Sequence, residues 1–162
     1  MRLRARLAWT TLAGLLVARN APAGLLDSPP PSLDGGERAT IVYRMGAVHF
    51  EPGGWVDTTF TCTNLGTVPA QLALEIFDEN DQPTGQIART MVAAGAGATF
   101  VTSADANVPG AVAIPGLPPI DHGKARVSAS TNQLSCTAIN RMRAADGTIK
   151  EAALELIKKV AY

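Results

Sequence analysis

Hydrophobic and polar residues alternate along most of the chain after residue 38, and a period of two is the pattern of β-strands with one buried face. The segment 56–64 shows this alternation most clearly. Its two faces consist of Val56, Thr58, Phe60 and Cys62, which we expect to point inward, and of Asp57, Thr59, Thr61 and Thr63, which we expect to contact water. This phase predicts that Cys62 lies on the buried side of its strand.

The same pattern predicts seven short strands separated by turn sequences rich in Gly, Pro, Asn and Asp. We expect them over residues 39–50, 56–64, 70–78, 87–94, 98–103, 124–130 and 134–140. Seven strands at this spacing predict an all-β domain, built as a two-sheet antiparallel sandwich.

The C-terminal segment 148–160 fits two structures. Thr148 followed by Glu151 matches a capping box, and the apolar residues that follow recur at helical spacing. A sandwich needs a last strand to close a sheet edge, and Leu154, Leu156 and Val160 also alternate. The alternatives are a short helix and a strand within residues 154–160, and the fold context favours the strand.

The segment 105–123 contains four prolines and three glycines, and we expect a long loop there without regular strand. Long loops on rigid scaffolds often carry binding sites, and this loop could also be a bridge whose apolar residues cover the open end of the core. If it binds a ligand, the candidate residues are Asp105, Val108, Pro109, Pro115, Leu117 and His122.

The N-terminal residues 1–23 have the pattern of a secretory signal peptide. Three arginines precede an apolar run over residues 7–18, and small residues precede a predicted cleavage after Ala23. An uncleaved anchor is the alternative, but this run of about 12 residues is shorter than the roughly 20 that span a bilayer. Residues 24–37 have the composition of a Pro/Gly linker, and 38–162 form the predicted domain.

Removal of the signal peptide changes the charge of the protein. The full chain has 14 basic and 14 acidic residues, and four of the arginines lie within residues 1–23. The mature chain therefore keeps ten basic and fourteen acidic residues, a net charge of −4. Nucleic acid and anionic membranes both require a positive surface, so we expect neither as a partner.

Cys62 and Cys136 are the only cysteines of the chain, and each lies in a β-branched segment. A secreted protein with an even number of cysteines normally oxidises them, so we expect one disulfide that links two strands across the core. Closing a loop of 74 residues would stabilise the fold by roughly 4–5 kcal/mol in the chain-entropy model. Two buried free thiols, or a nucleophilic or metal-binding cysteine, are the alternatives.

With Cys62 on an early strand and Cys136 on a late one, residues 38–162 resemble an immunoglobulin-like sandwich. Two positions depart from that family: Trp55 precedes the first cysteine instead of following it, and Leu134 replaces the tyrosine before the second. The Phe-x-Cys-Thr-Asn and Leu-x-Cys-Thr segments are also similar to those of small exported bacterial proteins of uncharacterised role. These resemblances imply a fold and a secreted or periplasmic location, but no activity.

The two histidines of the chain, His49 and His122, could bind a metal ion only if both met Asp121 or Glu51. The sequence Asp121-His122-Gly123 also fits a turn before a strand, which needs no metal ligand, so we expect no metal site and no cofactor. Gly-x-Ser-x-Gly, His-Glu-x-x-His and phosphate-binding glycine motifs are all missing from the sequence, so we expect no enzymatic activity.

The predicted function is therefore a non-enzymatic binding or structural module outside the cytoplasm, with an unidentified protein or carbohydrate ligand. A subunit of an extracellular, pilus-like assembly is the first alternative, with residues 24–36 as a connecting arm. An enzyme with an unrecognised site is the second.

Overall fold

The computed structural model describes residues 29–53, 55–103 and 108–158. The predicted signal peptide with its cleavage position at Ala23, the loop residue Asp105 and Val160 lie outside these ranges. Within them the chain forms one 3-10 turn and ten strands: η1 (Asp34–Gly36), β1 (Thr40–Phe50), β2 (Val56–Asn64), β3 (Ala70–Phe77), β4 (Pro83–Val92), β5 (Gly97–Val101), β6 (Val112–Ala113), β7 (Ile120–Ala129), β8 (Leu134–Arg143), β9 (Ile149–Leu154) and β10 (Leu156–Lys158).

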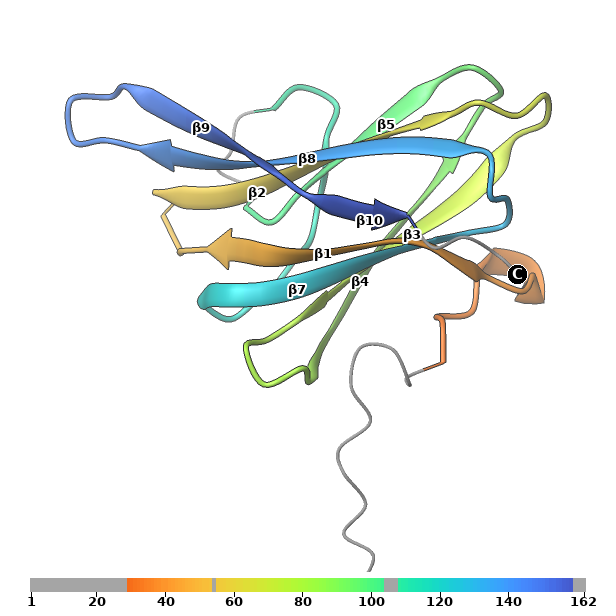
Figure 1. The fold of residues 1–162 in the computed structure, drawn as a ribbon, viewed down its shortest axis with the longest axis horizontal. Helices are drawn as coiled ribbons and strands as arrows, with labels where there is room; N and C mark the ends of the chain where they lie inside the picture. Colours follow the sequence, from red (N-terminus) through yellow and green to blue (C-terminus); the bar gives the residue numbers. More distant parts are fainter. Residues whose placement is uncertain (1–28, 54, 104–107, 159–162) are drawn as a thin grey trace, which may run out of the picture.

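The strands form two five-stranded sheets, which confirms the all-β sandwich (Figure 1). Sheet A has the order β10-β1-β7-β3-β4, and sheet B has the order β6-β5-β2-β8-β9. All described strand pairs are antiparallel except β5 and β6. The C-terminal segment is extended, so the strand alternative is confirmed. It pairs first with β8 as β9 and then with β1 as β10, and it thereby covers one edge of each sheet.

The inward faces of both sheets enclose one hydrophobic core. Phe60 and Phe100 from sheet B pack with Leu72 and Leu74 from sheet A, and all four side chains are fully buried. Each such side chain contributes about 1.5–3 kcal/mol through removal from water. The hydroxyl of Tyr43 crosses between the sheets and donates a hydrogen bond of 2.8 Å to the carbonyl of Leu134.

The disulfide between Cys62 and Cys136 is present, and both cysteines pack against the core as their strand phase predicts. Its position differs from the expectation of a link across the core. The two residues are directly opposite each other on β2 and β8, neighbouring strands of sheet B, with Cα atoms 4.1 Å apart. It also differs from the disulfide between the two sheets of antibody domains.

Part of the outer face of sheet A is also covered. Leu33 in the segment 29–36 is buried, and three side chains of the sheet hold that segment. Arg126 donates to the carbonyl of Pro29 (2.6 Å), Arg89 to that of Ser32 (3.3 Å) and Gln71 to that of Asp34 (3.0 Å). This cover explains why β3 is buried on both faces and not on one. The segment with linker composition is thus packed from Pro29 onward.

Two other sequence-based expectations were wrong in detail. Asp57 and Thr59 were expected to contact water, but both are buried, and Asp57 is the direct cross-strand neighbour of Arg141. The loop expected over 105–123 contains the short strand β6 and the first four residues of β7. No helix within the described ranges is long and apolar enough to cross a membrane.

Candidate functional site

The pairing between the end of β1 and the start of β7 contains a β-bulge. Val48 pairs with Gly123, and Phe50 pairs with Ile120, so His49 alone on β1 faces two residues, Asp121 and His122, on β7. In a regular strand, neighbouring side chains point to opposite faces, whereas a bulge re-aims them. The bulge therefore allows Asp121 and His122 to approach the same histidine.

Gly123 makes this tight pairing possible. A Cβ atom at this position would lie 2.4 Å from Cγ2 of Ile120 and 2.6 Å from the carbonyl oxygen of Phe77. The backbone of Phe77 cannot move away without disturbing the pairing of β3 with β7. A residue without a side chain is thus required directly after the Asp121–His122 pair.

The three side chains converge on one another. Nδ1 of His49 lies 3.3 Å from Oδ1 of Asp121, and Nε2 of His122 lies 3.6 Å from Oδ2 of the same carboxylate. The two imidazole rings meet edge to face, with centroids 5.2 Å apart. The His49 side chain is 24% exposed, while Asp121 and His122 are 82% and 74% exposed. The cluster is therefore anchored on one side and open to solvent on the other.

The backbone of His49 is fixed by polar side chains from β2 and from the residue that follows β5. Its N–H donates to the hydroxyl oxygen of Thr58 (2.9 Å), and its carbonyl oxygen lies 3.0 Å from the Thr58 hydroxyl and 3.3 Å from that of Thr102. Asn140 donates to the carbonyl of Ala47, two residues earlier (2.8 Å). Thr58 and Thr102 are fully buried, so they hold the histidine from the interior of the sandwich.

A hollow of about 200 Å³ lies beside the cluster. Its charged lining residues are Glu51, Glu79 and Asp121, and neither lysine nor arginine lines it. His49 also borders a second hollow of about 300 Å³, whose charged lining residues are Arg141, Lys150 and Glu151. The charged groups that line the hollow beside Asp121 are thus carboxylates, and they favour a positively charged ligand.

The convergence of two imidazoles and a carboxylate was not expected from the sequence. Such a site requires that both histidines meet Asp121 or Glu51, and no pattern in the sequence indicates that they do. The missing information was strand pairing: if β1 and β7 are placed side by side, His49 falls opposite residues 121–122. A bulge at that point carries no sequence signature that we recognise.

The other candidate loop residues do not assemble into a site. Leu117 is buried in the core together with Ile114 and Ile120, as the bridge interpretation of the loop predicts. Val108 is half-buried, while Pro109 and Pro115 are exposed. Of the proposed loop residues that the structure describes, His122 is the one that meets other chemically active side chains.

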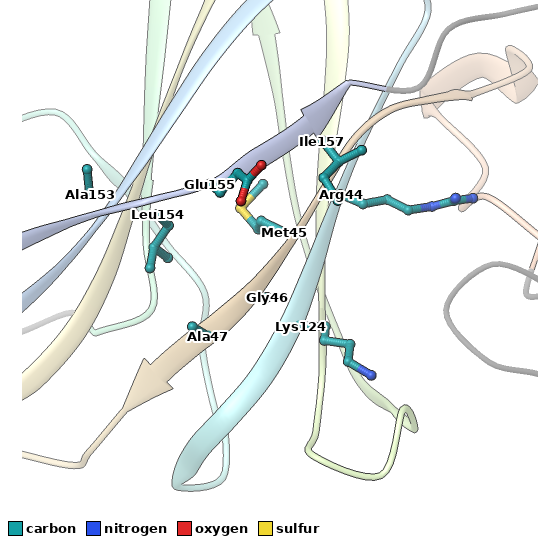
Figure 2. Close-up of a pocket in the computed structure, with 9 residues that line it drawn as sticks. All are labelled: Arg44, Met45, Gly46, Ala47, Lys124, Ala153, Leu154, Glu155 and Ile157. Carbon is teal, nitrogen blue, oxygen red and sulfur yellow. The ribbon is translucent and has the colours of Figure 1, made fainter.

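A larger hollow of about 490 Å³ lies where the chain crosses from β9 to β10 (Figure 2). Met45, Leu154 and Ile157 supply much of its apolar wall, and the side chains of Arg44 and Lys124 extend away from Glu155. It exists because β10 pairs with β1 only at residues 43–45, which leaves Gly46 and Ala47 uncovered. The residues that line this hollow include no pair of a nucleophile and a general base.

Asp57 is a buried acidic residue on β2, directly before Thr58. Burial raises the pKa of its carboxyl above the ordinary value of 3.8, and the positive charge of Arg141 lowers it in part. The hydroxyl of Thr59 donates to its Oδ1 (3.3 Å). Asp57 is thus a stability determinant of sheet B, separate from the exposed cluster.

Comparison of the chain with protein-family models, with curated proteins and with solved structures finds no match.

Proposed function

We propose that the protein is an exported, non-enzymatic β-sandwich module that binds a ligand outside the cytoplasm, at the end of the sandwich formed by the β1–β7 bulge. The observation that carries this proposal is that both histidines of the chain, His49 and His122, meet Asp121 at one open surface. Polar groups that converge on a solvent-exposed point of a rigid scaffold are the usual form of a binding site.

The location outside the cytoplasm is supported by two independent features. Residues 1–23 have the pattern of a signal peptide, and a disulfide between Cys62 and Cys136 persists in oxidising compartments. The immunoglobulin-like resemblance fits the same location.

The alternative of a pilus-like assembly has less support. Such assemblies exchange an N-terminal strand between subunits, and the connecting arm would be residues 24–36. From Pro29 onward this segment is held on the protein's own sheet A by Arg126, Arg89 and Gln71. Exchange would require the loss of these contacts and the exposure of Leu33.

The test is to express the full chain with its own N-terminus in a bacterial host. We expect the protein in the periplasm or medium, cut after Ala23, with a non-reduced mass two hydrogens below that of the dithiol. Sedimentation velocity at two concentrations should give a monomer at both. Retention in the cytoplasm with free thiols would contradict export, and concentration-dependent growth to large species would favour the assembly.

A deletion of the loop is not a useful test of the binding end. Ile114 and Leu117 lie within the core, so their removal would unfold the domain whatever the loop binds. Substitutions at the exposed residues Asp121 and His122 are the appropriate probes.

A further inference from the structure

We infer that the ligand of the His49–Asp121–His122 cluster is a divalent late first-row transition-metal ion, for which Zn²⁺ is the reference. The inference rests on the proposed function, because it names the ligand class of the binding end. It starts from the observation that one ligand atom from each residue lies within 4.8 Å of the other two.

Each imidazole nitrogen lies near one oxygen of the Asp121 carboxylate, at close to the separation of two ligands in tetrahedral coordination. Ligand atoms bound at about 2.0–2.1 Å to a tetrahedral Zn²⁺ lie about 3.3–3.4 Å from one another. Oδ1 of Asp121 lies 3.3 Å from Nδ1 of His49, Oδ2 lies 3.6 Å from Nε2 of His122, and one ligand atom from each of the three residues lies within 4.8 Å of the other two. Small rotations of two exposed side chains would complete the set, while His49 stays fixed through its backbone bonds to Thr58.

The donor set also selects the kind of metal. Imidazole nitrogen suits Zn²⁺, Cu²⁺ and Ni²⁺, whereas Ca²⁺ and Mg²⁺ prefer oxygen ligands throughout. Cu²⁺ should bind more tightly than Zn²⁺, in the order common to nitrogen and oxygen ligands. Three protein ligands leave a fourth position to water, and the exposure of Asp121 and His122 keeps that position accessible.

The hollow beside Asp121 favours a cation, because neither lysine nor arginine lines it. Glu51 and Glu79 line the adjacent hollow together with Asp121. Arg141 and Lys150 line the second hollow that His49 borders, together with Glu151, and they do not line the hollow beside Asp121. The carboxylates of Glu51 and Glu79 therefore add negative charge near the site without belonging to its ligand set.

The test is a calorimetric titration of the exported, oxidised and tag-free protein with Zn²⁺ and, separately, with Mg²⁺. We expect saturable binding of one Zn²⁺ per chain and none of Mg²⁺. Loss of an outer-shell partner weakens metal binding by about 10–100-fold, so Asp121→Asn and His122→Ala should weaken it at least that much. Glu79→Gln is the matched control, since it removes a nearby charge without removing a ligand, and should change affinity by less than about threefold.

Denaturant unfolding of the metal-free variants should match the wild type, because Asp121 and His122 are exposed. The inference is overturned by absence of one-to-one Zn²⁺ binding, by wild-type affinity in Asp121→Asn, or by an equal loss in Glu79→Gln. Each of these outcomes would leave the export and the monomeric state of the protein as measured, so failure of the metal assignment is distinguishable from failure of the proposed function.

Discussion

Oδ1 of Asp121 lies 3.3 Å from Nδ1 of His49, although strands β2 to β6 separate the two residues along the chain. The contact follows from the antiparallel pairing of β1 with β7 and from one bulge in that pairing. Thr58 holds the backbone of His49 from the interior, and Gly123 allows β7 to pack closely directly after Asp121 and His122. The site therefore depends on how β1 pairs with β7, and substitutions that disturb this pairing should affect it.

Gly123→Ala tests the bulge. The added Cβ would clash with Ile120 and with the backbone of Phe77, and overpacking of this kind costs about 1–3 kcal/mol. We expect a lower midpoint in urea unfolding and weaker Zn²⁺ binding. Gly46→Ala, at the neighbouring irregularity of β1, is the control, because its Cβ would meet no atom within 4 Å. Equal stability of the two variants would contradict the steric argument.

Replacement of both cysteines tests the link within sheet B. Cys62→Ala combined with Cys136→Ala should lower the free energy of unfolding by about 2–5 kcal/mol, because the unfolded chain regains the entropy of a long loop. Reductant should produce a similar loss in the wild type and no change in the double variant. If reductant does not change the unfolding midpoint of the wild type, the disulfide contributes little to stability.

The buried pair of Glu75 and Arg126 should tolerate the loss of both charges better than the loss of one. Nε of Arg126 lies 2.5 Å from the Glu75 carboxylate, the guanidinium covers the ring of Phe77, and the Arg126 side chain is 1% exposed. Arg126→Met leaves an uncompensated buried carboxylate and should cost about 3–5 kcal/mol. Arg126→Met combined with Glu75→Leu should cost less. A double variant less stable than Arg126→Met, measured by chemical unfolding, would contradict this account.

Asp57 should destabilise the fold at neutral pH. Burial raises its folded pKa above 3.8, so the folded state carries an ionised group that the unfolded state solvates better. Asp57→Asn should therefore raise the free energy of unfolding at pH 7. The difference between variant and wild type should vanish as pH falls through the folded pKa toward 3.8, because Asp57 becomes neutral.

Asp146 should show the opposite sign and serves as the comparison. Its pKa is lowered because Thr148 donates its hydroxyl (2.7 Å) and its backbone N–H (2.9 Å) to Oδ1. This stabilisation is present above pH 3.8 and is lost as pH falls through the lowered folded pKa. Asp146→Asn should thus reduce stability at neutral pH. The same sign for both variants in unfolding curves across pH 3–8 would contradict the assignment of causes.

Local patterns in the sequence were sufficient for much of the fold. The alternation over 56–64 gave the bounds of β2 and the inward face of Cys62, because side-chain period alone determines both. The burial of Asp57 was missed because it depends on a cross-strand neighbour, Arg141, and strand pairing is not encoded in one strand. The cover of sheet A by the segment around Leu33 was missed for the same reason.

The C-terminal segment shows how a local signal can serve another purpose. Thr148 and Glu151 fit a helix cap, yet Thr148 donates to Asp146 in the turn between β8 and β9, and Glu151 lies 3.6 Å from Nε of Arg141 on the next strand. Pairing with β8 and β1 outweighs the helical signal, since it covers one edge of each sheet. The His49–Asp121–His122 cluster likewise depends on strand pairing, because β1 and β7 must be neighbours for it to form.

The most direct test of the binding end is NMR of the histidine side-chain nitrogens during addition of Zn²⁺. The chain contains two histidines, so after signal removal the spectrum reports His49 and His122 alone. We predict that Nδ1 of His49 and Nε2 of His122 shift together and reach saturation at one equivalent of Zn²⁺. Rings that remain unshifted, or a single ring that responds without saturation near one equivalent, would contradict the assignment of this surface as a metal-binding site.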